Sequence, residues 1–156
     1  MSTFLITGNV GLFTTEILAT LGKEHRLVIA GNTQFLTRER NVHVYKTAPI
    51  EEKFSQLFDV YSIDVVWYIS GFADGGNGTF GENQNIEKVM KECRRSKVDK
   101  VIFLSTVESR NFLKKYGNSG IVLDKEYPHS RSFCAAQAEE ICSYYAKAHH
   151  LKVILL

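Results

Sequence analysis

Cysteine and proline are both scarce in this chain of 156 residues, which holds three cysteines and two prolines. The cysteines are odd in number, and none stands at the spacing of a metal-ligand motif. They therefore predict thiols in a reducing cytosol and no metal site. Cys134 and Cys142 are expected on one helix, eight residues apart, which is too far for a disulfide within that helix.

An excess of charge of either sign is absent as well. Lysine and arginine number 19 and aspartate and glutamate 17, so the formal net charge is +2. This balance gives no reason to expect nucleic-acid or membrane partners. No apolar run approaches the roughly 18 residues of a membrane span, and the N-terminus shows no cationic segment followed by an apolar core. We therefore expect a cytoplasmic protein.

What the chain does contain is an alternation of short apolar runs and amphipathic segments. With 156 residues, 44% of them hydrophobic, it is long enough for one domain with a substantial core. The expected strands are Phe4–Ile6, Arg26–Ala30, Val42–Tyr45, Val65–Ile69, Val101–Leu104 and Val153–Leu156. The expected helices are Leu12–Leu21, Ile50–Tyr61, Asn83–Lys97 and Ser132–His149. This alternation predicts a three-layer α/β domain, in which helices cover both faces of a parallel sheet.

The stretch from Thr3 to Thr14 predicts a nucleotide-binding turn. A short apolar run ends in Thr7-Gly8, a second glycine follows at Gly11, and a helical pattern then begins. Glycines at such a turn let the backbone approach a pyrophosphate, and the helix N-terminus supplies free N–H groups with a partial positive charge. The candidate cofactor-binding residues are Thr7, Gly8, Asn9, Val10, Gly11 and Leu12 in this turn, and Asn32, Ser70, Gly71 and Ser105 after later strands.

Five segments of the chain carry a family resemblance. They are Thr7-Gly8-x-x-Gly11, Tyr68-Ile69-Ser70-Gly71, Asn83 at the start of a helix, Val98–Thr106 and Lys147–Leu156. In this order and at this spacing they resemble the short-chain dehydrogenase/reductase superfamily, and within it the extended branch of nucleotide-sugar epimerases and dehydratases. The resemblance implies a Rossmann fold with a parallel sheet in the order 3-2-1-4-5-6 and an NAD or NADP cofactor. Thr14 departs from the family pattern, which has a glycine there.

The resemblance covers the whole chain but only part of such an enzyme. Members of this branch continue into a substrate-binding lobe after the sixth strand, where this sequence ends. We expect residues 1–156 to form one NAD(P)-binding domain, which is either a fragment of a larger protein, with the other domains of that protein among its partners, or a minimal module. The sequence indicates no oligomeric state.

The catalytic pair that the resemblance implies is missing. The family pattern Pro-x-x-Tyr-x-x-x-Lys-x-x-x-Glu aligns with Pro128–Glu139, so that Arg131 replaces the tyrosine and Ala135 the lysine. A register shifted by two residues pairs Phe133 with Gln137, and neither side chain transfers a proton. The active site is therefore degenerate, and no residue is assigned as catalytic. The weak candidates are Ser105 and Thr106 after the fifth strand, and Tyr127, which precedes Arg131 by four residues.

The choice between NAD and NADP stays open. The acid that grips the adenosine ribose in this fold is expected about 20 residues after the glycines, but the second strand ends in Gly31-Asn32. Asn32 could bind a ribose hydroxyl, and Arg38 and Arg40 could reach a 2′-phosphate. A further expectation concerns the glycine-rich segment Gly71–Gly81, which is predicted to be a mobile loop beside the ligand.

Three functions remain open at this point. The first is a non-catalytic NAD(P)- or nucleotide-binding domain that serves as a sensor or regulator. The second is an oxidoreductase or epimerase with a displaced acid/base, such as Tyr127 or Tyr116. The third is a structural scaffold that binds proteins and no cofactor, which the departures at Thr14 and Asn32 favour.

Overall fold

The computed structural model describes residues 1–11, 14–31, 39–71, 80–106 and 131–156. Its strands are β1 (Thr3–Gly8), β2 (Arg26–Ala30), β3 (Val42–Tyr45), β4 (Val65–Ile69), β5 (Lys100–Leu104) and β6 (Val153–Leu155). Its helices are α1 (Thr14–Leu21), α2 (Glu52–Val60), α3 (Phe80–Arg95) and α5 (Arg131–His149). Each strand and helix predicted from the sequence is found at its expected place along the chain.

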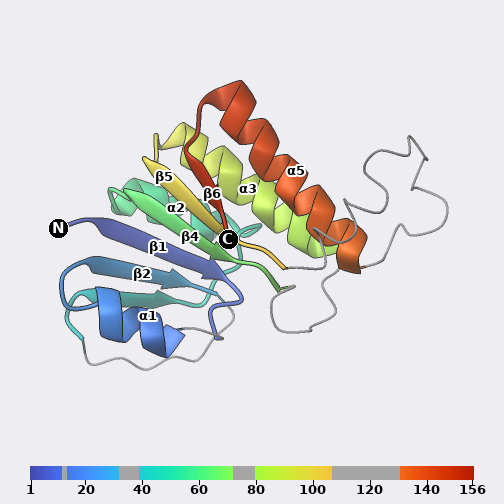
Figure 1. Cartoon of the computed structure of the whole chain (residues 1–156). Helices are drawn as coiled ribbons and strands as arrows, with labels where there is room; N and C mark the ends of the chain where they lie inside the picture. The colour runs from blue at the N-terminus through green and yellow to red at the C-terminus, as the bar shows by residue number, and fades with distance from the viewer. Residues whose placement is uncertain (12–13, 32–38, 72–79, 107–130) are drawn as a thin grey trace, which may run out of the picture.

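The six strands form one parallel sheet with the order β3-β2-β1-β4-β5-β6 (Figure 1). Strand β1 is central, because it pairs with β2 on one side and with β4 on the other. The predicted Rossmann architecture is thus confirmed. The strand order reverses at β1, and in open α/β sheets ligands bind outside the carboxyl ends of the strands at such a reversal.

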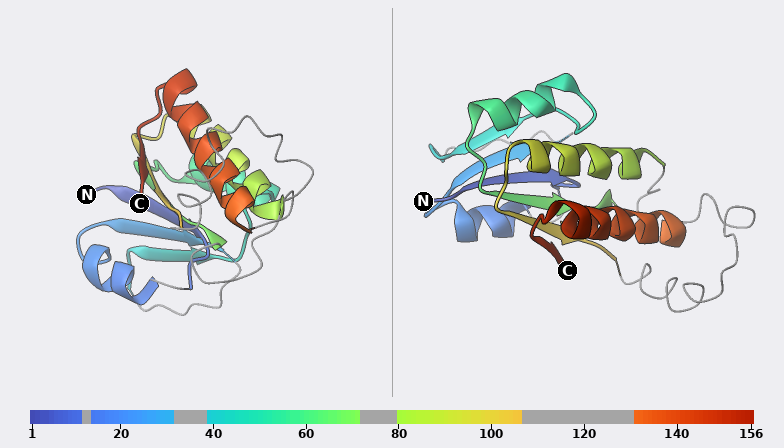
Figure 2. Two further views of the ribbon diagram at one scale, coloured as in Figure 1. Left: turned by 45° about the vertical axis from the view of Figure 1, so that its right-hand side comes forward. Right: turned by 90° about the horizontal axis from the view of Figure 1, so that it is seen from above.

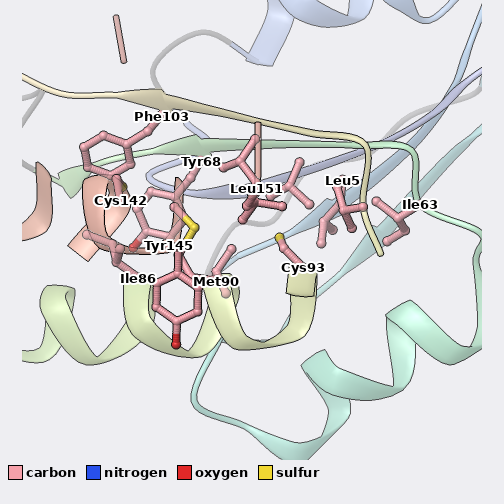
Figure 3. Close-up of a cluster of buried hydrophobic side chains, with 14 of the residues drawn as sticks. Leu5, Ile63, Tyr68, Ile86, Met90, Cys93, Phe103, Cys142, Tyr145 and Leu151 are labelled. Atoms are coloured by element: carbon pink, nitrogen blue, oxygen red, sulfur yellow. The ribbon is translucent and has the colours of Figure 1, made fainter. Parts of the chain in front are cut away.

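Helices cover both faces of the sheet. Figure 2 shows α1 on one face and α2 and α3 on the other, and α5 packs with them. Neighbouring residues of β1 serve the two layers: Leu5 belongs to a large buried cluster with α2, α3 and α5, and Ile6 to a smaller cluster with α1. In the larger cluster the rings of Tyr68 and Phe103 stack at a centroid distance of 5.7 Å (Figure 3). Burial on both faces explains why the strands are almost continuously apolar.

The helix ends differ from the sequence-based prediction by a few residues. Helix α3 spans Phe80–Arg95 rather than Asn83–Lys97, and α2 is shorter than expected at both ends. Lys97 adopts a left-handed φ of 54°, and the Val98 N–H donates to the Cys93 carbonyl. A left-handed residue followed by such a backward hydrogen bond ends a helix, which explains why α3 stops before Lys97.

All three cysteines are buried free thiols, as expected. Burial, followed by the nearby charge of Glu139, raises the pKa of Cys142 to about 12, and burial also raises the pKa of Cys93 and Cys134. In the ranges that the structure describes, no three side chains of the metal-ligating kinds gather around one point. No helix in those ranges has the length and apolar character needed to cross a bilayer.

A buried carboxylate fastens α2 to α3. Glu92 is 5% exposed and accepts hydrogen bonds from Ser55 Oγ of α2 at 3.0 Å and from Arg95 Nε at 2.7 Å. Lys88 Nζ lies 3.0 Å from the same carboxylate, and Arg95 also pairs with Asp59 of α2 at 2.8 Å. Burial alone would raise the pKa of Glu92, but the hydrogen bonds from Lys88, Arg95 and Ser55 lower it below its ordinary value.

Candidate functional site

The carboxyl ends of three neighbouring strands meet at one edge of the sheet. Gly8 in β1 is in register with Ile69 in β4, and Ile69 with Leu104 in β5. The segments that follow these strands therefore lie side by side: the turn after Gly8, then Ser70, then Ser105. This edge brings together most of the predicted cofactor-binding residues.

The turn after β1 holds its own shape through backbone contacts. Gly8 has a left-handed φ of 90°, and a Cβ there would overlap the Ile69 carbonyl oxygen. The Asn9 N–H donates to that same oxygen at 2.7 Å, and the Val10 N–H donates to the Gly8 carbonyl at 3.0 Å. The fold itself therefore requires glycine at position 8. The sequence predicted that Asn9 and Val10 bind the cofactor, but in the structure their backbone N–H groups make the hydrogen bonds that hold the turn.

Gly11 plays a different part from Gly8. It is exposed, and a Cβ at Gly11 would meet no heavy atom of the described chain within 4 Å. Between the two glycines, Val10 is 2% exposed, and its side chain packs against Gly31 at the end of β2. Val10 thus closes the turn onto β2. Gly11 leaves open space just before α1, where a pyrophosphate would meet helix N–H groups.

Two fully buried hydroxyl groups at this edge have no hydrogen-bond partner among the described residues. They are Thr7 Oγ1 near the end of β1 and Ser70 Oγ after β4. Buried hydroxyl groups in native proteins are normally hydrogen-bonded. Both side chains are 0% exposed, so these two hydroxyls lie beneath the surface of this edge.

A carboxylate from α3 also reaches the strand ends. Glu82 accepts a hydrogen bond from the Gly71 N–H at 2.8 Å, so this backbone donor of a predicted cofactor-binding residue is already used. The buried Tyr68 lies beside Glu82. Burial, and then the charge of Glu82, raises the pKa of the Tyr68 hydroxyl well above its ordinary value. Tyr68 therefore stays protonated near neutral pH.

The positions aligned with the family's catalytic pair carry no proton-transfer group. Ala135 is 0% exposed and packs in the large core cluster, and the half-buried Phe133 packs against the same cluster. Gln137 accepts a hydrogen bond from Asn83 Nδ2 of α3 at 3.0 Å. The backbone of Arg131 begins α5, and its side chain lies outside the description. In either register, the aligned positions of α5 carry neither a lysine ammonium nor a tyrosine phenol.

Ser105 and Thr106 follow β5 directly, as predicted. Ser105 Oγ donates to Glu139 Oε1 of α5 at 2.5 Å, and Thr106 is half-buried. Glu139 stands four residues after Ala135 and therefore shares its helical face. Sequence reasoning aligned Glu139 with the last residue of the family pattern but gave it no role, because its contact with β5 appears only in the packed structure.

A hollow of about 340 Å³ follows β3 and is lined by Lys46, Thr47, Ala48 and Glu51. Thr47 Oγ1 donates to Glu51 Oε2 at 2.9 Å, and Lys46 is exposed. Strand β3 neighbours β2, after which this fold places the adenosine ribose. Sequence reasoning did not single out Lys46, because a lone lysine after a short strand belongs to no motif.

Several predicted residues lie outside the described part of the chain. They are Leu12, Asn32, Arg38, Tyr116, Tyr127 and residues 72–79 of the glycine-rich loop. Thr14 is the first residue of α1, and its side chain also lies outside the described part of the structure. Arg40 is described and exposed.

No protein-family model matches the sequence, and neither does any curated protein. Solved structures do match the fold. The structure of UDP-glucuronic acid 4-epimerase from Bacillus cereus in complex with NAD is similar, with a TM-score of 0.71 and 19% identity. The match covers 98% of this chain and 55% of the epimerase chain. UDP-N-acetylglucosamine 4-epimerase from Methanobrevibacter ruminantium matches 99% of this chain over 53% of its own, with a TM-score of 0.70 and 18% identity. An oxidoreductase from Lactococcus lactis matches 98% of this chain over 67% of its own, with a TM-score of 0.67 and 17% identity.

The chain has the Rossmann fold of these nucleotide-sugar epimerases. It spans about half the length of the two epimerases that it matches. At identities below 20%, the match confirms the fold predicted from the resemblance, whereas the activity of the whole enzymes is a separate question.

Proposed function

We propose that the chain binds NAD or NADP at the carboxyl edge of its sheet without catalysing a reaction. In this role it is a sensor or regulatory domain of the epimerase/dehydratase type. The proposal rests on the contrast between two parts of the site. Gly11 leaves open space shortly before α1, whereas α5 has Ala135 or Gln137 where the resemblance expects a lysine.

Binding is supported by the geometry of the turn and by its surroundings. Gly8 fixes the turn against β4, which leaves Gly11 in open space next to the N-terminus of α1. The unpartnered hydroxyls of Thr7 and Ser70 lie buried just beneath the same edge, where a ligand would reach them only if the edge opened. A negatively charged pyrophosphate is stabilised at such a helix start by the N–H groups and the partial positive charge of the helix.

The scaffold hypothesis remains the second candidate, and one observation favours it. The hydrogen bonds of the Asn9 and Val10 N–H groups close the turn without any ligand. A turn that satisfies itself in this way is stable in a protein that binds nothing. The two hypotheses therefore differ in a measurable quantity, which is the stabilisation of the chain by a dinucleotide.

Thermal unfolding in the presence of NAD⁺, NADH, NADP⁺ and NADPH tests the proposal. A ligand at a hundred times its Kd stabilises the folded state by about 2.7 kcal/mol, which raises Tm by about 5–10 °C for a domain of this size. Gly11→Val should abolish the shift, because its side chain fills the open space. Ala19→Val, on the exposed side of the same helix, should leave the shift unchanged.

The unmutated protein decides between the two candidates. If millimolar concentrations of all four dinucleotides leave its Tm unchanged, binding is refuted and the scaffold hypothesis stands. A Gly8 variant is unsuitable for this test, because the overlap with Ile69 damages the fold whether or not a ligand binds.

A further inference from the structure

The residue after β3 lies beside the place where this fold binds the adenosine ribose. That ribose lies near the end of the second strand, which here ends at Ala30. Tyr45, the last residue of β3, is in register with Ala30, and its carbonyl accepts a hydrogen bond from the Gly31 N–H at 3.1 Å. Lys46 follows Tyr45 directly, so it leaves the sheet at the same carboxyl edge, one strand away from Gly31.

The end of β2 lacks the group that selects NAD. In this fold an acid near this point binds the ribose 2′-hydroxyl of NAD, whereas a nearby cation accommodates the 2′-phosphate of NADP. The sequence has Gly31-Asn32 there, and neither residue carries a charged side chain. A 2′-phosphate therefore meets no repulsion from an acid at the end of β2.

Lys46 supplies a cation at this place. Its side chain is exposed, and among the described residues no carboxylate forms an ion pair with it. Neighbouring strands lie about 4.7–4.9 Å apart, and the flexible four-carbon stem of a lysine spans one such spacing. The ammonium of Lys46 can therefore stand over the end of β2, where it attracts a phosphate as a compact point charge.

The hollow of about 340 Å³ beside Lys46 leaves room for a phosphate group. Thr47 and Glu51 also line this hollow, and the Thr47 hydroxyl donates to the Glu51 carboxylate at 2.9 Å. Glu51 is thus engaged by its own neighbour and not by Lys46. Its negative charge nevertheless opposes a phosphate, so loss of that charge should strengthen the attraction that Lys46 creates.

Arg40, which the sequence offered as a cation for the same phosphate, lies at the opposite edge of the sheet. It precedes β3, and the carbonyl of the next residue, Asn41, accepts a hydrogen bond from the Leu27 N–H near the start of β2. Ligands of this fold bind outside the carboxyl ends of the strands. Arg40 therefore lies a full strand length from the adenosine ribose and is no partner for a 2′-phosphate.

We propose that the chain prefers NADP to NAD, and that Lys46 makes this selection by binding the 2′-phosphate in the hollow after β3. The inference rests on the proposed function, because it names which of the two cofactors the same site takes. The 2′-phosphate is the one group by which the two cofactors differ, so a single cation beside the adenosine ribose decides between them.

Calorimetric titration with NAD⁺ and NADP⁺ tests the inference. The unmutated chain should bind NADP⁺ about tenfold more tightly, the order of magnitude of one charge-assisted contact. Lys46→Ala should lower the affinity for NADP⁺ to that for NAD⁺ and leave the affinity for NAD⁺ unchanged. Lys46→Arg should keep the preference, since it keeps the charge. The preference should also shrink in about 1 M salt, because salt screens exposed charges.

Two other variants separate a local contact from a general attraction between charges. Arg40→Ala removes the same charge at the opposite edge and should leave the tenfold preference intact. Glu51→Gln removes a negative charge from the hollow and should raise the preference above tenfold, while the glutamine oxygen still accepts the Thr47 hydrogen bond. Lys46, Arg40 and Glu51 are all exposed, so each variant should fold, and thermal unfolding without ligand verifies this.

Each contrary outcome overturns the inference. Equal affinity of the unmutated chain for both cofactors, or tighter binding of NAD⁺, refutes the preference and leaves the proposed function standing. If Arg40→Ala weakens NADP⁺ as much as Lys46→Ala does, the preference reflects overall charge and no contact of Lys46. An unchanged preference in Glu51→Gln puts the phosphate outside the hollow and refutes the site. Failure of the unmutated chain to bind either cofactor refutes the proposed function as well.

Discussion

Replacement of Gly8 by alanine should destabilise the domain even when no ligand is present. A φ of 90° at Gly8 costs a residue with a side chain on the order of 1–3 kcal/mol. The added Cβ also overlaps the Ile69 carbonyl oxygen, so the turn must move away from β4. This movement weakens the 2.7 Å hydrogen bond from the Asn9 N–H, which is worth about 1 kcal/mol. The expected loss is about 2–4 kcal/mol in the free energy of unfolding.

Thermal unfolding followed by far-ultraviolet circular dichroism, without cofactor, measures this loss. For a domain of this size 1 kcal/mol corresponds to about 2–4 °C, so Gly8→Ala should lower Tm by about 5–15 °C. Gly11→Ala is the matched control and should change the stability by no more than about 0.5 kcal/mol, because its Cβ enters open space. A Gly8→Ala protein that melts with the unmutated chain would refute the reasoning, and so would equal losses at both glycines.

Two further predictions concern buried groups. The pKa of Glu92 is lower in the folded chain than its ordinary value of 4.5, so its stabilising effect is present above that value and is lost as the pH falls through the lowered pKa. Glu92→Gln should therefore lower the free energy of unfolding by about 1–3 kcal/mol at neutral pH and by less in acid. Urea unfolding at the two pH values measures both losses, and equal losses would contradict a stabilising role of the Glu92 charge. Because burial raises the pKa of Cys93 and Cys142, a chromogenic thiol reagent should label them slowly in the folded chain and rapidly in urea; rapid labelling of the folded chain would rule out their burial.

The fold could be predicted from the sequence because burial determines where apolar residues stand in its strands and in its helices. A strand covered on both faces reads as a continuous apolar run, as Val65–Ile69 does, and a helix with one covered face reads as apolar residues at three- and four-residue spacing. The strand order came from the family resemblance, since apolar patterning does not state which strands are neighbours. The end of α3 could not be read, because Lys97 adopts a left-handed conformation that a lysine does not signal.

The site could be predicted only in part. The two glycines of the turn look alike in the sequence, but they differ because Gly8 lies against Ile69, a residue 61 positions later. The same reason hid Glu139, since its hydrogen bond to Ser105 depends on how α5 packs on β5. Local motifs identify the backbone that a ligand approaches, whereas the contacts that assign a role to each side chain come from distant segments.

The side chains along the site also predict that the isolated chain has no turnover. Proton transfer by a positioned side chain contributes typically about 10²–10⁴ to an enzymatic rate. Ala135 has no titratable group, and the amide of Gln137 is bonded to Asn83. The raised pKa of Tyr68 keeps its proton in place, and the Ser105 proton is directed to a carboxylate. None of these groups replaces the tyrosine–lysine pair of the family.

We therefore expect no change in nicotinamide absorbance when the chain is incubated with NAD(P) and a panel of sugar nucleotides and simple carbonyl compounds. A displaced tyrosine could still supply the acid/base, and the sequence offers Tyr127 and Tyr116 as candidates, of which Tyr127 precedes Arg131 by four residues. Tyr127→Phe tests it, with Tyr144→Phe as the control, because Tyr144 is 58% exposed on α5. Clear turnover that Tyr127→Phe abolishes and Tyr144→Phe preserves would make the chain an enzyme with a displaced acid and would overturn the non-catalytic proposal. Absence of turnover in a chain whose Tm rises with NAD⁺ is the result that we expect, since binding of a dinucleotide at the turn near Gly11 would need no group that moves a proton.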